Sequence, residues 1–207
     1  FTNYHTAPIC SASRAALLTG RNPHSVRVAG HAAAAMPLRA HEGAIPPEDG
    51  SLAANMKPAG YVTFALGKWD HLPTNEMTPA GPFARWPVGQ GFDRFYGFLG
   101  ADADNFAPPL TQDTSAVARP DGAGYHLDRD LADKAIAMIQ SRAASGTPAP
   151  FLMYFATGTA HAPHHAPQEW ITAMRGRFDG GWDKARETIL KRQIAKGLLP
   201  ASATLAP

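Results

Sequence analysis

The sequence predicts an α/β fold in which a mostly parallel sheet is flanked by helices. Two short apolar runs, residues 61–66 and 151–156, have the length and composition of buried strands. A helical segment precedes each run, at 51–57 and at 128–144, and a polar loop follows each one. The order helix, strand and polar loop, occurring twice, is typical of an α/β layer with parallel strands.

The first predicted helix begins near Arg14. Ser11 or Ser13 can cap it, and the Ala-Ala-Leu-Leu run that follows favours helix. Gly20 is expected to end this helix, because glycine readily adopts the left-handed conformation of a helix C-terminus.

The other elements follow from turn residues and hydrophobic spacing. Helix 51–57 is bounded by a proline and a glycine, and helix 128–144 is amphipathic. The side chains that form the apolar face of helix 128–144, counting the hydrocarbon part of Arg142, recur at helical spacing: Leu131, Ala135, Met138, Ile139 and Arg142. The remaining predictions, in chain order, are loop at 28–47, mostly loop at 72–127, and helices at 168–175 and 182–196. No repeat or linker divides the chain, so residues 1–207 are predicted to form part of one domain.

Composition narrows the class of protein. The chain has 207 residues, of which 44% are hydrophobic and 17% charged, as in globular proteins. Its net charge of +2 gives no signal for nucleic-acid binding, and no apolar run is long enough to span a membrane. The single cysteine excludes an internal disulfide and leaves the redox compartment open.

Three polar positions are expected to meet at one edge of the sheet. Lys68 and His161 each come just after a predicted strand, and ligands of such sheets bind at the carboxyl ends of the strands. Cys10 comes at a helix start, where free backbone N–H groups favour an anion. Arg14 adds a planar, charged guanidinium group suited to oxyanions. A lone cysteine is most often a small buried hydrophobe, but this context indicates a working site.

Five short motifs follow one another along the chain. They are C-S-A-S-R at 10–14, G-K-W at 67–69, G-F-D-R-F-Y-G-F at 91–98, A-H-A-P at 160–163 and R-G-R-F-D-G-G-W at 175–182. In this order they resemble the motifs of the type I sulfatases of the alkaline phosphatase superfamily, and the first match extends from Asn3 to about Pro23, with Ala12 at the third motif position, where proline is commoner. The resemblance is closest to bacterial arylsulfatases, and we assign the 91–98 and 175–182 runs mainly to packing and loop architecture.

The resemblance implies a sulfuric ester hydrolase whose nucleophile is a formylglycine made from Cys10. In the family, a hydroxyl of the hydrated formylglycine attacks sulfur, and the aldehyde reforms as sulfate departs. Arg14 and Lys68 would neutralise charge on the sulfuryl oxygens. His161 would bind sulfate and protonate the leaving oxygen. A formylglycine-generating enzyme or equivalent maturase is the implied partner, and a small sulfate ester, most simply an aryl sulfate, the implied substrate.

The second motif departs from the family pattern. The family has histidine directly after G-K-W, whereas this chain has Asp70 there and His71 one residue later. A loop can absorb a shift of one residue, so we favour His71 in the family role, with Asp70 as the alternative. His164 and His165 have no role that the resemblance transfers; they could line the substrate entrance.

The family also implies a calcium ion (Ca²⁺) or another hard divalent cation, held by oxygen ligands. Its acidic ligands should precede Phe1 and follow Pro207, which leaves the formylglycine at Cys10 as the metal contact within this chain. We therefore expect a partial catalytic domain, without its first strand and C-terminal part, that is inactive alone and binds Ca²⁺ poorly. The compartment stays open between bacterial cytoplasm and periplasm.

Two other functions fit the same motifs. Phosphonate or phosphodiester hydrolysis in the same superfamily can also use a formylglycine. A non-catalytic relative that binds sulfated ligands would keep the fold but leave Cys10 unmodified.

Overall fold

The protein is described by a computed structural model that covers residues 4–146 and 149–206. Asn3, where the resemblance to the sulfatases begins, lies outside these residues. The described chain forms two compact units. The larger, Thr6–His165, contains the sheet and all the predicted site residues. The smaller comprises the rest and contains helices α4 (Gln168–Ala173) and α5 (Gly181–Ala195).

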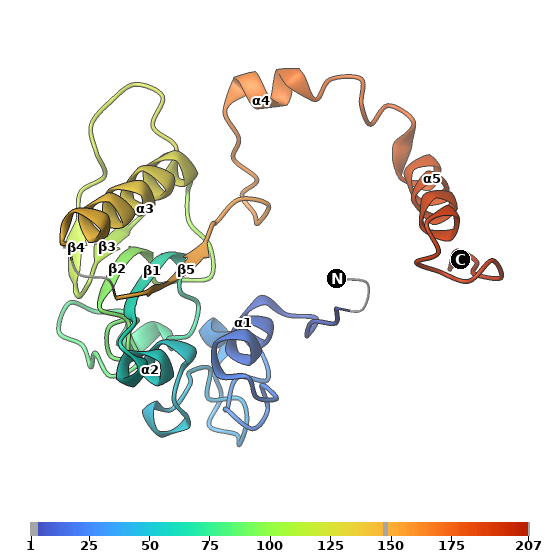
Figure 1. The fold of residues 1–207 in the computed structure, drawn as a ribbon. Coiled ribbons are helices and arrows are strands. Elements are labelled where there is room, and N and C mark those ends of the chain that lie inside the picture. Colours follow the sequence, from blue (N-terminus) through green and yellow to red (C-terminus); the bar gives the residue numbers. More distant parts are fainter. Residues whose placement is uncertain (1–3, 147–148, 207) are drawn as a thin grey trace. The chain divides into compact units, whose positions relative to one another are not determined.

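The larger unit is built on a five-stranded sheet with the strand order β4-β3-β2-β1-β5 (Figure 1). β1 pairs in parallel with both β2 and β5, whereas β3 and β4 add an antiparallel edge. The prediction of a mostly parallel α/β sheet is therefore confirmed at its centre. The strands are β1 (Val62–Lys68), β2 (Arg94–Phe98), β3 (Leu110–Gln112), β4 (Ser115–Val117) and β5 (Phe151–Ala156).

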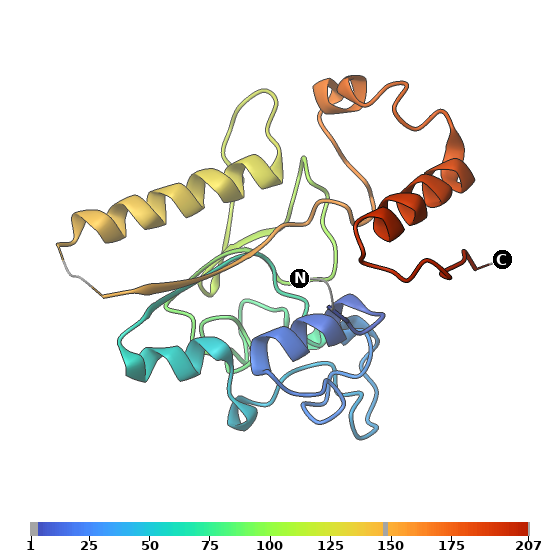
Figure 2. The same cartoon turned by 45° about the vertical axis from the view of Figure 1, so that its right-hand side comes forward.

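Helices cover both faces of the sheet, as Figure 2 shows. Helix α3 (Leu127–Ala144) lies on one face, while α1 (Cys10–Thr19) and α2 (Leu52–Met56) lie on the other. Side chains alternate accordingly along β1: Phe64 packs in the core beneath α3, and Ala65 packs in the core that α1 and α2 share. Because both faces are covered, the central strand is nearly all apolar, as its sequence indicated.

Helix α1 differs from its prediction at the start and agrees at the end. It begins at Cys10, with Ile9 as N-cap and no side-chain cap, not near Arg14. The expected serine caps bond elsewhere: Ser11 donates to a carboxylate of another segment, and Ser13 donates to the carbonyl of Ala7. Tertiary partners therefore replace local capping. Gly20 ends the helix in the left-handed conformation, with φ of 68°.

The other predicted helices are confirmed within one or two residues at most ends. α2 is capped by Ser51 and runs into a 3₁₀ turn that ends at Gly60. On α3, Leu131 and Ala135 are buried, whereas Ile139 is 40% exposed. The described residues also form short 3₁₀ helices at Ala32–Ala34, Pro47–Asp49, Lys57–Ala59 and Thr74–Glu76. The first of these lies in stretch 28–47, which is otherwise loop with one bridge between Val28 and His41.

Stretch 72–127 is mostly loop, as expected, but it also contains β2, β3 and β4, and the 91–98 run that we assigned mainly to packing and loop architecture supplies β2. These strands have only three to five residues, and β2 is stabilised by pairing with the more distant β1, a signal that local sequence does not carry. The expectation that 151–156 is buried was wrong, because β5 forms an edge of the described sheet and Phe155 is 43% exposed.

Among the described residues, the search for a helix both long and apolar enough to cross a membrane found none.

Candidate active site

Arg14 ties helix α1 to two strands. Its guanidinium Nη1 donates to the carbonyl oxygen of Lys68 at 3.0 Å and to the hydroxyl of Tyr154 at 2.7 Å. Arg14 lies one helical turn from Cys10, Lys68 ends β1, and Tyr154 lies on β5. The guanidinium therefore fixes the start of α1 beside the carboxyl end of the central strand.

A buried polar network lies next to this arginine. The ammonium Nζ of Lys68 is 3.2 Å from Oδ2 of Asp70, and these side chains are only 3% and 1% exposed. Ser11 donates its hydroxyl proton to the same carboxylate oxygen at 2.9 Å and accepts the backbone N–H of Ala32 at 3.2 Å. Each charge therefore has the partner that burial requires.

Cys10 is half-buried and carries a free thiol. Its Sγ lies 3.9 Å from Nδ1 of His31, on the loop between α1 and α2. Sequence reasoning missed His31, because a histidine in a loop 21 residues away carries no local signal for such a contact. It also missed Tyr154, whose only signal was an aromatic side chain inside a predicted strand.

The structure places Asp70, not His71, in contact with Lys68. The backbone N–H groups of Trp69 and Asp70 still bond to the carbonyls of Phe98, the last residue of β2, and of Leu99, which follows it. Asp70 then adopts a left-handed φ of 62° and directs its carboxylate to the lysine. The strand-like pairing thus extends past Lys68, so a one-residue shift is not simply absorbed by a loop.

His71 is turned into the core. It packs edge-on against Trp69 with 5.3 Å between ring centroids, and neither ring nitrogen has a hydrogen-bond partner among the described residues. Burial lowers the pKa of His71 to about 3, opposed in part by the nearby Asp70 carboxylate. The imidazole is therefore neutral at physiological pH.

This neutral histidine makes stability depend on pH. The pKa of His71 is about 3 when folded and 6.5 when free, so below pH 6.5 the unfolded chain binds a proton that the folded chain does not. We expect its contribution to cost about 2 kcal/mol of stability between pH 8 and pH 5. Urea unfolding at several pH values measures this loss. His71→Leu should flatten the profile; a profile unaltered by this substitution would contradict the assignment.

His161 lies in the loop after β5, as expected. Its Nδ1 is 2.9 Å from the carbonyl oxygen of Ala162, and within the described ranges no hydrogen bond or ion pair joins it to Arg14 or Lys68. His165 instead lies 3.1 Å from a carboxylate oxygen of Asp104. The structure therefore brings Arg14, Lys68 and Asp70 together, with Cys10 one helical turn from Arg14, and leaves His161 on the loop after β5.

The described residues do not fit a complete cation site. In residues 4–146 and 149–206, no group of three or more His, Cys, Asp or Glu side chains could hold a metal ion. Ca²⁺ takes six to eight oxygen ligands, and Asp70 already contacts Lys68 and Ser11. The expectation that most metal ligands come from elsewhere stays a prediction.

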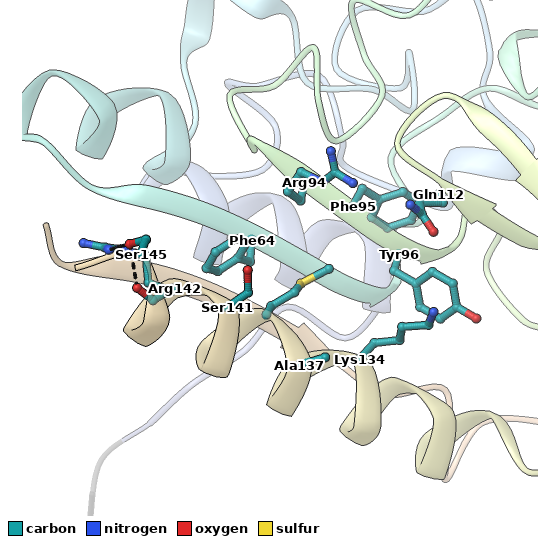
Figure 3. Close-up of a pocket in the computed structure, with 11 residues that line it drawn as sticks. Phe64, Arg94, Phe95, Tyr96, Gln112, Lys134, Ala137, Ser141, Arg142 and Ser145 are labelled. Carbon is teal, nitrogen blue, oxygen red and sulfur yellow. Dashed lines mark hydrogen bonds between the residues drawn. The ribbon is translucent and has the colours of Figure 1, made fainter. Parts of the chain in front are cut away.

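A cavity of about 520 Å³ lies apart from this cluster, between α3 and the sheet (Figure 3). It opens beside Phe64 and Arg94, which pair near the amino ends of β1 and β2, whereas Lys68 pairs at their carboxyl ends. Its cations are engaged: Lys134 lies over the Tyr96 ring, 4.8 Å from its centroid, and Arg94 pairs with Asp113. None of the predicted site residues lines it, so we do not assign the chemistry to this cavity.

Comparison with solved structures agrees with the fold described above. The crystal structure of Ps i-CgsB superposes with a TM-score of 0.66 at 25% identity, covering 83% of this chain and 39% of that one. The same protein in complex with k-i-k-neocarrahexaose gives a TM-score of 0.64 over 81% of this chain. These matches support the sulfatase-like fold, of which the chain covers a part.

Sequence comparison identifies the family. An uncharacterized sulfatase of Schizosaccharomyces pombe is 29% identical over 231 residues, covering 100% of this chain and 39% of the relative. Human N-acetylgalactosamine-6-sulfatase is 30% identical over 197 residues, covering 86% of this chain and 36% of the relative. The chain thus spans about two fifths of these relatives, which are eukaryotic, so a bacterial origin remains a prediction. The sequence model of the Sulfatase family matches residues 1–201, and the chain therefore belongs to that family.

Proposed function

We propose that the complete protein hydrolyses sulfate esters at the cluster around Cys10. One observation carries the proposal: two cationic side chains, Arg14 and Lys68, are held beside the helix start at which Cys10 lies. A sulfuryl group carries its charge on oxygens, and guanidinium, ammonium and free backbone N–H groups at a helix start are the donors that such oxygens favour. Membership of the Sulfatase family supports the same chemistry.

Cys10 is the residue that we propose is oxidised to formylglycine. Its side chain is partly exposed and free of disulfide bonds, so it fits a residue that must be modified and then meet substrate. The hydrated aldehyde would supply the hydroxyl nucleophile. Arg14 and Lys68 would bind sulfuryl oxygens, and His31, beside the side chain of residue 10, can accept or donate a proton there. A maturase that recognises the 10–14 motif is the implied partner.

His161 is proposed to protonate the leaving oxygen. Its loop follows β5 at the same end of the sheet as Lys68, because β5 and β1 run parallel.

The metal ligands and the rest of the catalytic domain are proposed to lie in other parts of a longer polypeptide. The relatives support this proposal, since the chain covers only about two fifths of their length.

The substrate is proposed as a sulfate ester of a sugar or an aryl alcohol. The named relatives include an N-acetylgalactosamine-6-sulfatase and a steryl-sulfatase, the mouse form of which is 41% identical over 92 residues, or 44% of this chain. These names differ in the alcohol and share the sulfate ester. The residues that we describe at the site address the sulfate, so the alcohol stays open.

Substitution of His161 tests the acid role. In the complete protein, His161→Ala should reduce turnover of alkyl or sugar sulfates by about 10²–10³-fold and that of nitrophenyl sulfate far less. A poor leaving group needs a proton as the bond breaks, whereas nitrophenolate does not. Steady-state kinetics on the two substrates measure the difference. Equal losses on both would argue against proton donation by His161, and His164→Ala on the same loop is the matched control.

The proposed function as a whole is tested in two measurements. The peptide containing Cys10, isolated after expression with a maturase, should be lighter by about 18 Da than the unmodified peptide. The complete protein should turn over an aryl sulfate faster than an aryl phosphonate. Faster phosphonate turnover would favour the rival hydrolase of the same superfamily. An unmodified Cys10 together with sulfate binding but no turnover would indicate a non-catalytic relative.

A further inference from the structure

A carboxylate is built into the proposed anion site. Asp70 is 1% exposed, and its Oδ2 lies 3.2 Å from the ammonium of Lys68. Arg14, in contrast, bonds among the described residues to neutral oxygens, those of the Lys68 carbonyl and the Tyr154 hydroxyl. The site therefore holds two cations and one anion, and its net charge is one unit lower than its two cationic side chains alone would give.

The groups around the Asp70 carboxylate do not change the net charge of the site. His71 follows it and is neutral, because burial lowers its pKa to about 3. The hydroxyl of Tyr154 is also neutral, because burial raises its pKa above the ordinary value. In the part of the chain that the structure describes, no second carboxylate pairs with Arg14 or Lys68. Asp70 is thus the single negative charge in contact with the cationic cluster.

The charge of the ligand decides what this carboxylate does. A sulfate monoester carries one negative charge, and a phosphate monoester of nearly the same shape carries two above its second pKa of about 6. Asp70 repels both, but it repels the doubly charged group about twice as strongly. Burial keeps water from screening this difference.

We propose that Asp70 is a specificity-determining residue that favours singly charged sulfuryl groups over doubly charged phosphoryl groups. This inference rests on the proposed function only in taking the cluster as the place where the ester anion binds. The alternative is a purely structural ion pair, in which Asp70 holds Lys68 and Ser11 in place without affecting which anion binds.

Two substitutions separate these roles. Asp70→Asn removes the charge and keeps a side chain of the same shape that can still accept the Ser11 hydroxyl. Ser11→Ala removes that hydrogen bond, which measures 2.9 Å, and keeps the charge. If charge sets specificity, only the first variant changes the preference between anions; if the network is merely structural, both variants weaken binding of the two anions alike.

The experiment is isothermal titration calorimetry, which measures the dissociation constants of methyl sulfate and methyl phosphate for the complete protein at about pH 8.5. All proteins carry Cys10→Ala, so that no turnover interferes. Asp70→Asn should improve binding of methyl phosphate relative to methyl sulfate by about ten-fold or more. Ser11→Ala should change that ratio by less than about two-fold, because it alters no charge. An unchanged ratio in Asp70→Asn would overturn the inference and leave the proposed function standing.

A second measurement follows the charge of the ligand as pH changes. Methyl phosphate gains its second charge between about pH 5 and pH 8, and this gain should favour binding to Asp70→Asn by about ten-fold more than binding to the parent, whereas methyl sulfate should show the same pH dependence in both proteins. An equal pH dependence of methyl phosphate binding in the two proteins would contradict the inference. Failure of either anion to bind the parent at any pH would instead remove the anion site and, with it, the proposed function.

Discussion

Gly67→Ala is expected to destabilise the larger unit by about 4 kcal/mol or more. Gly67 lies in β1, paired with Ala156 of β5, and has a φ of 93° that side chains rarely adopt. A Cβ built at this position would lie 1.9 Å from the carbonyl oxygen of Ala156 and 2.7 Å from its carbon. Both obstructing atoms are backbone, so relief requires the two parallel strands to separate.

Gly60→Ala provides the matched control for this variant. Gly60 also has a left-handed φ, of 83°, but a Cβ there would meet no atom within 4 Å. Its replacement should therefore cost only the backbone term of about 1–2 kcal/mol. Urea denaturation followed by circular dichroism compares the two variants. Equal losses would show that φ alone accounts for the effect and that β1 and β5 do not approach as closely as described.

The close approach of β1 to both neighbouring strands explains why a glycine precedes Lys68 in the G-K-W motif. Gly97 faces Gly67 from β2, and a Cβ on Gly97 would lie 2.0 Å from the Gly67 carbonyl oxygen. Glycines on adjacent strands thus allow the sheet to close at the end where Lys68 contacts Arg14. The sequence shows these glycines as members of two separate motifs, and only the pairing of the strands shows that they serve one contact.

Local pattern predicted the elements whose signal lies within a single segment. The apolar run of β1 and the 3.6-residue spacing of α3 are of this kind, since each buries its own face against the rest. β2 to β4 could not be predicted in this way. They are short: β2 pairs with the more distant β1 and β3, and β3 and β4 are three-residue strands of a single hairpin.

The candidate site shows the same division. Motif resemblance named Cys10, Arg14 and Lys68, and the structure brings Arg14 to Lys68. The motif resemblance could not decide between Asp70 and His71. Which of these two adjacent side chains faces the lysine depends on backbone pairing beyond the end of the strand. The contact of Arg14 with Tyr154 spans 140 residues and required the three-dimensional fold.

The second large effect is expected at Arg14. In the complete protein, Arg14→Ala should lower kcat for sulfate ester hydrolysis by about 10²–10³-fold, the usual cost of removing one donor that stabilises developing charge on oxygen. The variant also leaves the Lys68 carbonyl and the Tyr154 hydroxyl without this donor. Some loss of stability, about 1–3 kcal/mol, should therefore accompany the loss of activity.

Tyr154→Phe separates these two consequences, because it removes the same 2.7 Å hydrogen bond and keeps the arginine charge. Its melting temperature should fall as that of Arg14→Ala does, since the tyrosine is partly buried against the core, while its kcat should stay within about ten-fold of the parent. Arg14→Lys should recover only part of the activity, because an ammonium keeps the charge but lacks the planar fork that holds two oxygens at once. If Tyr154→Phe lost as much activity as Arg14→Ala, the arginine would act on the reaction only by holding β5 and α1 together, and the sulfuryl oxygens would have to be bound by Lys68 and the helix start alone.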